Sequence, residues 1–382
     1  MPPTIGAIMA VTHDICIRGA GIVGRTLALL LARERLRVAL VASPRPPDAA
    51  DVRAYALSPA SRALLQSLRC WPAESAATPV LGMQVRGDGA GQVHFSAAAQ
   101  GVDALNWIVD VPALEQQLTQ ACQFQGDIDV VDEPVAAQLT VVCEGRASRT
   151  RAEWGVEFDR TPYPQHAIAT RLDCELPHGQ IARQWFTADG EILAFLPLDG
   201  PQGHRVAVVW SVRAERVPEL MALPDGAVAA MLADLSGHAL GALQLCAPRA
   251  TWPLVLAAAQ RWVGRVPDAP QRSFALAGDA AHAMHPLAGQ GLNVGLGDAA
   301  ELASVLAARE PWRTPADLKL LRRYERARQG EWLRMRLATD SLQLLFGRPE
   351  PLAAAARNWG MRLFDASGPI KSGITRLAMG TA

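Results

Sequence analysis

The sequence lacks the features that define several large classes of protein. Lys+Arg and Asp+Glu both number 37, so no net charge favours nucleic acid as a partner. Six cysteines include no C-x-x-C pair and no regular spacing, which excludes a zinc or disulfide framework and fits a reducing cytoplasm. No run of 18 apolar residues occurs, and the first 14 residues lack the basic start and apolar run of a signal peptide. We therefore expect a cytoplasmic protein without a membrane span.

The sequence has enough apolar material for more than one core. It contains 382 residues, 50% of them hydrophobic and 19% charged, which is typical of a compact enzyme with two or more domains. A strand at 14–18, a helix from about 25 to 33 and a strand at 38–41 indicate a βαβ unit. Further on, the patterns predict helices at 58–71 and 111–123, an apolar strand ending at 145, short strands at 83–85 and 92–96, mostly strand over 167–210, and long helices after 291.

A glycine-rich turn joins the first strand to the first helix. Gly19, Gly21 and Gly24 have the G-x-G-x-x-G spacing, which is specific only in this strand-to-helix context. The first glycine permits the tight turn, the second lets the backbone approach a pyrophosphate, and the third allows close helix–strand packing. Free N–H groups and the positive end of the helix dipole then favour phosphate. The acid that usually holds the adenosine ribose is absent, because Ala42 stands there.

A second glycine-rich stretch, FALAGDAAHAMHPLAGQGLNVGLGDA, lies at 274–299. An apolar strand ends there at Gly278-Asp279, where a carboxylate can accept hydrogen bonds from the hydroxyl groups of a sugar-like chain. Gly289-Gln290-Gly291 then precedes another predicted helix, so a second helix N-terminus is available for charge on the ligand. The two stretches together indicate one long cofactor with charge at both ends.

These motifs resemble those of the aromatic-ring flavin monooxygenases, the para-hydroxybenzoate hydroxylase superfamily. The 274–299 stretch is similar to their second FAD motif, CEGRASRTR at 143–151 to their Asp-Gly motif, and Asp51-x-Arg53 to the segment after the second strand. The ending YERARQGEW resembles the ubiquinone-biosynthesis hydroxylases in particular.

The resemblance implies an α/β fold with three parts. These are a Rossmann-like FAD-binding domain with a central parallel sheet (1–80, 106–160 and 265–310), a mainly antiparallel β-sheet substrate domain (81–105 and 161–264), and a C-terminal helical region (311–382). It also implies a cofactor site that comprises Gly19, Gly21, Ile22, Val23, Gly24, Arg53, Gly278, Asp279, Pro286, Gly289, Gln290, Gly291, Leu292 and Asn293.

The implied activity is hydroxylation of an aromatic ring. In this family NAD(P)H reduces FAD, O2 forms a flavin hydroperoxide, and one oxygen passes to the ring without a metal. The expected substrate is a polyprenylated phenol of ubiquinone biosynthesis. His285 and Pro286 are the candidate catalytic residues, whereas His282 could carry a proton or only hydrogen-bond within its loop. The aromatic residues Trp185, Phe186, Phe195 and Trp210 lie in the sheet expected to face the flavin, where they would form core or line a pocket.

Three departures from the family pattern keep alternatives open. Ala42 replaces the ribose acid, Glu144 replaces the Asp of the Asp-Gly motif, and the chain between 122 and 139 is too short for the usual β-meander. Each departure puts FAD affinity in doubt. A hydroxylase of small soluble aromatics, or a flavin-poor scaffold in a ubiquinone-biosynthesis assembly, would also fit the sequence.

The C-terminal part is basic. Residues 311–382 contain 13 Lys/Arg against 6 Asp/Glu. The arginines form either a solvated face or a peripheral contact with the anionic inner face of the membrane.

Overall fold

The first layer of the protein is a six-stranded sheet. The structure is a computed structural model that describes residues 12–42, 51–87, 91–187, 189–283 and 291–346. The strand order is β16-β17-β9-β1-β2-β8, and all neighbours are parallel except β16 and β17. The strands are β1 (His13–Arg18), β2 (Val38–Val41), β8 (Ile128–Val131), β9 (Ala137–Val142), β16 (Val263–Val266) and β17 (Ala269–Leu276). The predicted central parallel sheet is therefore confirmed.

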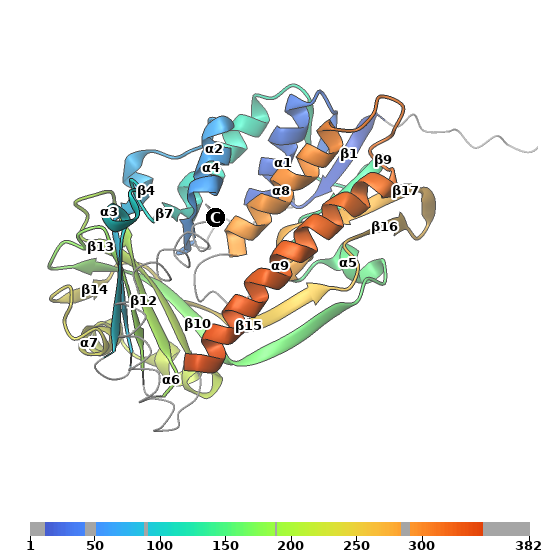
Figure 1. The fold of residues 1–382 in the computed structure, drawn as a ribbon. Helices are drawn as coiled ribbons and strands as arrows, with labels where there is room; N and C mark the ends of the chain where they lie inside the picture. The colour runs from blue at the N-terminus through green and yellow to red at the C-terminus, as the bar shows by residue number, and fades with distance from the viewer. Residues whose placement is uncertain (1–11, 43–50, 88–90, 188, 284–290, 347–382) are drawn as a thin grey trace, which may run out of the picture.

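Helices cover one face of this sheet (Figure 1). They are α1 (Ile22–Arg33), α4 (Val111–Gln123), α8 (Gly291–Ala307) and α9 (Leu318–Phe346). In α4 the buried residues Leu114, Leu118 and Cys122 recur every four positions, which gives the helix one apolar face. Leu321 and Tyr324 of α9 belong to the same core as α1 and α8. The C-terminal helix thus packs directly on the first layer, while the predicted three-part domain division stays a prediction.

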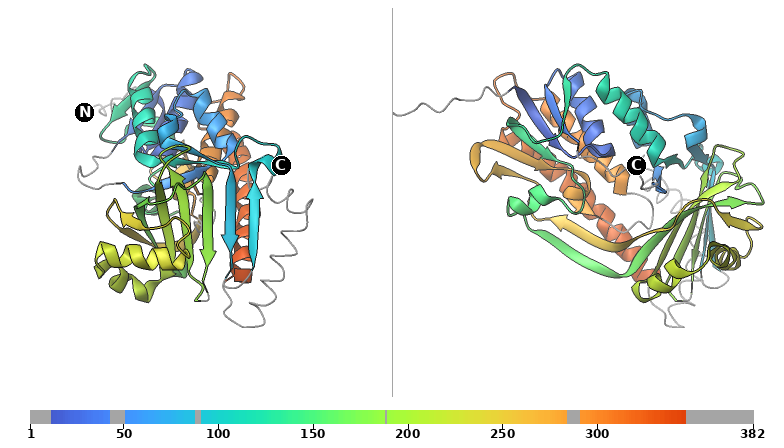
Figure 2. Two further views of the ribbon diagram at one scale, coloured as in Figure 1. Left: turned by 90° about the vertical axis from the view of Figure 1, so that its left-hand side faces the viewer. Right: turned by 180° about the vertical axis from the view of Figure 1, so that it is seen from behind.

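The second layer is a nine-stranded, mainly antiparallel sheet, as the resemblance implied (Figure 2). Its main path is β18-β15-β10-β13-β12-β11-β5-β6, and β14 pairs with β10. The strands are β5 (Gly82–Arg86), β6 (Gln92–Ser96), β10 (Phe158–Cys174), β11 (Ile181–Phe186), β12 (Ile192–Leu198), β13 (Arg205–Arg213), β14 (Leu243–Leu245), β15 (Ala250–Ala259) and β18 (His282–Ala283). Two helices, α6 (Val217–Ala222) and α7 (Asp225–Leu235), supply residues to the core on one face.

Small elements connect the two layers. A three-stranded sheet contains β3 (Ala54–Leu57), β7 (Asn106–Asp110) and β4 (Ala77–Val80). The short helices are α2 (Pro59–Ser67), α3 (Ala97–Gln100), α5 (Arg149–Glu153), η1 (Glu74–Ala76), η2 (Ala214–Arg216) and η3 (Gly278–Ala280). Ala56, Val80 and Ile108 of the small sheet pack against Ala207 and Leu198 of the large sheet. This contact fixes the substrate sheet against the segment that follows β2.

Local backbone geometry explains why some helices begin or end at residues other than those predicted. The helix expected at 58–71 ends at Ser67, because Arg69 adopts a left-handed conformation (φ 58°) that stops a helix. Ser58 caps its start by accepting a hydrogen bond from the Ser61 N–H. The first helix begins at Ile22, three residues earlier than expected, directly after Gly21. Only the short strand β8 separates α4 from β9, which agrees with the shortened sequence there.

Candidate cofactor site

The first glycine turn is shaped by close backbone contacts on one side and open space on the other. A Cβ atom on Gly24 would lie 2.0 Å from the Gly19 carbonyl oxygen, and a Cβ on Gly19 would lie 2.5 Å from the Cys143 oxygen. Gly19 also has a φ of 111°, which side chains rarely adopt. Around Gly21, no atom of the described residues lies within 4 Å of an added Cβ. This combination of tight packing and an open N-cap fits a bound pyrophosphate.

The fold brings the second glycine stretch against the first. Gly278 has a φ of 61°, and a Cβ there would lie 3.3 Å from the Val23 side chain. A Cβ on Gly295 of α8 would lie 2.8 Å from the same valine and 3.3 Å from the Gly278 Cα. Two segments about 250 residues apart in sequence therefore meet with only glycine-sized gaps between them. Helices α1 and α8 lie side by side at this point (Figure 1).

Asp279 stands in the short η3 helix at the end of β17. Its side chain is accessible from solvent, yet protein surrounds it closely enough that desolvation raises its pKa against the opposing charges of His282, Arg146 and Arg53. An accessible carboxylate with this environment can gain hydrogen bonds from a polyhydroxyl ligand without breaking internal ones. The geometry fits the role that the resemblance gives to Asp279, which stays a prediction.

Arg53 lies near Asp279 but is held by its own neighbours. Its Nε donates to Asp51 Oδ1 at 2.7 Å, and this hydrogen bond raises the pKa of the guanidinium. Arg171 of β10 donates to the backbone oxygens of Asp51 and Arg53 and to the carboxylate of Asp110 at 2.8 Å. Tyr55 is electrostatically coupled to both Arg53 and Asp279. No sequence motif predicts that Arg171 or Tyr55 lies near the cofactor site, because only strand pairing places these residues beside Arg53.

The other predicted site residues fall into two groups. Ile22 is buried, Gly291 starts α8, and Leu292 packs against the first core. Asn293 accepts hydrogen bonds from the Ser58 N–H at 2.9 Å and the Ser61 hydroxyl at 2.8 Å, so its side chain ties α8 to α2. His285, Pro286, Gly289 and Gln290 lie outside the described residues. A role for any of these residues toward the cofactor stays a prediction.

His282 is a buried structural histidine. Only 2% of its surface is exposed, its Nε2 lies 2.6 Å from Asp298 Oδ2, and its ring stacks on Trp262 at 4.9 Å. This agrees with the expectation of hydrogen bonding within the fold, although the partner comes from α8 rather than from the same loop. In the sequence, Asp298 stands out only as a polar residue in an apolar helix.

The charged residues that flank the first turn pair with each other. Arg18 Nε lies 3.1 Å from Glu144 Oε1. Glu144 also accepts from Ser148 and Thr150 at the start of α5. Partial burial favours a higher pKa for Glu144, but the hydrogen bonds from Thr150 and Ser148 hold it below its usual value. The longer acid in the Asp-Gly motif therefore stabilises the turn before α5.

Three large aromatic residues of the substrate sheet face away from the cofactor site. Trp185, Phe195 and Trp210 form a core with α6 and α7, and the first two rings are 5.0 Å apart. Successive side chains of a strand point to opposite faces of the sheet. Arg171 lies on the face toward the cofactor site, since its side chain donates to the backbone oxygen of Asp51. The face that carries Arg171 also carries small residues such as Ala167, Ala169 and Ala207. Of the two roles expected for the aromatic residues, core or pocket lining, Trp185, Phe195 and Trp210 have the core role.

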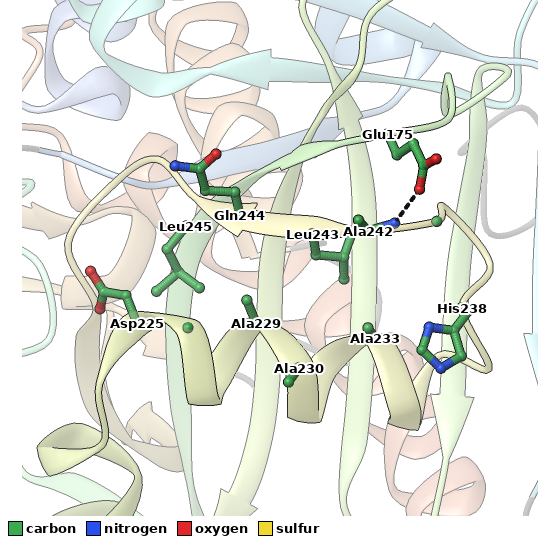
Figure 3. Close-up of a pocket in the computed structure, with 12 residues that line it drawn as sticks. Glu175, Asp225, Ala229, Ala230, Ala233, His238, Ala242, Leu243, Gln244 and Leu245 are labelled. Carbon is green, nitrogen blue, oxygen red and sulfur yellow. Dashed lines mark hydrogen bonds between the residues drawn. The ribbon is translucent and has the colours of Figure 1, made fainter.

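Two hollows are lined by residues outside the predicted cofactor site. A groove of about 670 Å³ runs between α7 and β14, lined by small and polar residues (Figure 3). Its walls include Ala229, Ala233, Leu243 and Glu175, which accepts a hydrogen bond from the Ala242 N–H. A smaller hollow of about 230 Å³ opens at Cys16, Arg18 and Trp154, next to the shortened connection that precedes β9. Neither contains a predicted cofactor residue.

Comparison with known proteins assigns the family. A family model described as an FAD binding domain matches residues 92–332. Ubiquinone hydroxylase UbiL of Rhodospirillum rubrum is 32% identical over 96% of this chain and 90% of its own length. The 3-demethoxyubiquinol 3-hydroxylase of Escherichia coli is 29% identical over 96% of this chain and 98% of its own length.

Solved structures agree on the fold. The p-nitrophenol 4-monooxygenase PnpA of Pseudomonas putida superposes with a TM-score of 0.72 at 19% identity, over 96% of both chains. PqsL of Pseudomonas aeruginosa, a probable FAD-dependent monooxygenase, gives a TM-score of 0.70 at 21% identity, over 91% of this chain and 99% of its own. With these relatives, this fold and two glycine turns meeting at an open N-cap, the chain belongs to the FAD-dependent monooxygenases of the para-hydroxybenzoate hydroxylase type, related to the ubiquinone hydroxylases.

Proposed function

We propose that this protein hydroxylates the aromatic ring of a polyprenylated phenol in ubiquinone biosynthesis, with NAD(P)H as reductant and O2 as oxygen donor. The observation that carries the proposal is the 32% identity with ubiquinone hydroxylase UbiL over 96% of the chain. The second relative, which hydroxylates a demethoxyubiquinol by its name, supports the same class of substrate. We further propose that the protein works in the cytoplasm.

The residues of the two turns would bind different parts of FAD. The N–H groups at the start of α1 would face the pyrophosphate beside Gly21, and Asp279 would accept hydrogen bonds from the ribityl chain. Bound FAD supplies hydride acceptance from NAD(P)H and activation of O2. The protein contributes orientation of the ring and exclusion of water.

Two measurements on this protein test the proposal. We expect purified protein to carry, or to take up on addition of FAD, the yellow absorption of a bound flavin. A strain without the protein should accumulate one prenylated precursor that lacks a ring hydroxyl, and complementation should remove it. Protein that stays colourless with excess FAD would favour the flavin-poor scaffold, whereas turnover of simple phenols with a normal quinone profile would favour the soluble-aromatic alternative.

We also propose that the exposed side of α9 contacts anionic lipid. Lys319, Arg322, Arg323 and Arg326 are exposed and follow helical spacing on one side of the helix. Among the acids near this face in sequence, Glu310 and Asp317 are paired with Arg313, and Glu325 accepts hydrogen bonds from the Trp262 and Val263 N–H groups. Trp312, just before this helix, is 79% exposed. Among the described helices, none combines the length and apolar composition needed to cross a bilayer, so such contact would be peripheral.

Reversing two charges of this face should weaken binding to anionic vesicles. Each basic residue near such a surface contributes about 1 kcal/mol, so Arg322→Glu with Arg323→Glu should lower binding by about 30-fold or more. Sedimentation with phosphatidylserine vesicles at low salt measures the effect. The matched control reverses Arg86 and Arg213, which are exposed on the substrate sheet. Equal binding of both variants and the wild type would contradict the proposal.

A further inference from the structure

A buried carboxylate in α8 holds the backbone of the Gly278–Asp279 turn. Asp298 is 0% exposed, and its Oδ2 accepts a hydrogen bond from the Gly278 N–H at 2.8 Å. The same oxygen lies 2.6 Å from His282 Nε2. Thus one side chain fixes both the residue before Asp279 and the residue three positions after it.

Arg328 of α9 completes this arrangement from the other side. Its Nε donates to Asp298 Oδ1 at 2.7 Å, and its Nη2 donates to the Val294 oxygen at 3.0 Å. Gly297 leaves the space for the guanidinium, since a Cβ there would lie 2.8 Å from Arg328 Nη2. Arg328 also pairs with Glu331 on its own helix. Arg328 is only 5% exposed, so it is enclosed between two helices.

Two more side chains hold the strand end and the turn. Tyr324 of α9 donates its hydroxyl to the Leu276 oxygen at 2.7 Å, before the turn. Arg151 of α5 donates to the Ala280 oxygen at 2.9 Å, after the turn. The backbone on both sides of Asp279 is therefore fixed by buried donors, while the Asp279 carboxylate itself stays accessible.

The charges of Asp298 and Arg328 compensate each other in this cluster. Burial alone would raise the pKa of Asp298, but the charges and hydrogen bonds of His282 and Arg328 hold it below its usual value. Removing one member of a buried ion pair leaves an unpaired charge, which is strongly destabilising, whereas replacing both by neutral groups is often tolerated. This difference allows a role in stability to be separated from a role in cofactor binding.

We infer that Asp298 and Arg328 are positioning residues for FAD, which fix the Gly278–Asp279 turn so that Asp279 presents its carboxylate to the ribityl chain. Neither side chain touches the cofactor in this scheme. The inference rests on the proposed function, because it assumes that Asp279 contacts FAD. It also makes α9 a required part of the FAD site rather than a separate tail.

Two double variants at matched stability test this inference. Asp298→Asn with Arg328→Met removes both charges and keeps an acceptor for the Gly278 N–H. Asp298→Leu with Arg328→Met removes both charges and the acceptor. We expect the Leu/Met variant to bind FAD at least tenfold more weakly than the Asn/Met variant, measured by quenching of flavin fluorescence on the apoprotein, with urea unfolding of each apoprotein as the stability measure.

The pair formed by buried Glu191 and half-buried Arg216, at the edge of β12 and in η2, provides the control. Glu191 is 2% exposed and lies 2.6 Å from Arg216. Glu191→Gln should lower stability but leave the FAD dissociation constant unchanged. If FAD affinity follows stability in all variants, including this control, Asp298 and Arg328 are merely structural and the inference is wrong.

Failure of the proposed function would look different. Wild-type protein would then bind no FAD, or it would bind FAD while the quinone profile of the deletion strain stayed normal. If the Leu/Met variant does not fold, Arg328→Lys serves instead, since it keeps the charge and loses the two-point contact. It should bind FAD more weakly than the wild type at a similar unfolding midpoint, and unchanged affinity would overturn the inference.

Discussion

Asp279→Ala should lower the affinity for FAD by about 100-fold while the chain stays folded. A charge-assisted hydrogen bond contributes about 1.5–3 kcal/mol, so losing one or two such bonds to ribityl hydroxyls accounts for a change of this size. Desolvation in the folded chain raises the pKa of Asp279, so folding makes ionisation of this carboxyl group less favourable than it is in the unfolded chain. Removing this carboxylate should therefore leave the stability of the apoprotein unchanged or slightly higher.

Titration of apoprotein with FAD, followed by flavin fluorescence, measures this effect. Asp279→Asn should retain part of the affinity, because the amide oxygen still accepts a hydrogen bond. The matched control is Asp268→Ala, which removes an exposed carboxylate from the turn between β16 and β17. Retention of stoichiometric, tightly bound flavin in Asp279→Ala would show that the ribityl chain binds elsewhere.

Gly24→Ala should lower the stability of the chain, whereas Gly21→Ala should leave stability unchanged and weaken FAD binding. An added methyl group on Gly24 would lie 2.0 Å from a backbone oxygen, so the helix must shift from the strand. We expect this overpacking to cost about 3 kcal/mol or more. A methyl group on Gly21 meets no atom of the described residues within 4 Å, so it should leave the apoprotein intact. It would instead occupy the space that we assign to the pyrophosphate.

Urea unfolding and FAD titration on the two variants separate these effects. We expect Gly24→Ala to lower the unfolding midpoint strongly. Gly21→Ala should keep the midpoint of the wild type and lose at least about tenfold in FAD affinity, since backbone N–H groups bind phosphate only at close approach. Normal FAD affinity in Gly21→Ala would place the pyrophosphate away from this turn.

Sequence patterns predicted the local elements with good accuracy where one interaction dominates. The apolar spacing in 111–123 predicted a helix with those bounds, and the βαβ unit around the glycine turn was confirmed. The helix at 58–71 ended early, because the left-handed conformation of Arg69 is not visible in apolar spacing. The sequence left open whether the aromatic residues of the substrate sheet form core or line a pocket, because alternation identifies two faces of a strand but not which one meets the flavin.

Residue types at fixed spacing were enough to identify the family, the mixed α/β class and the two glycine turns. The surroundings of the turns became known only from the packing of the folded chain. The contact of Val23 with Gly278 and Gly295, the reach of Arg171 across to Asp51, and the burial of His282 against Asp298 all join residues from different elements. Such contacts depend on how strands order in a sheet and how helices pack on it. The spacing of residues along the chain does not predict these contacts, because each contacting residue is only an ordinary polar or small residue within its own segment.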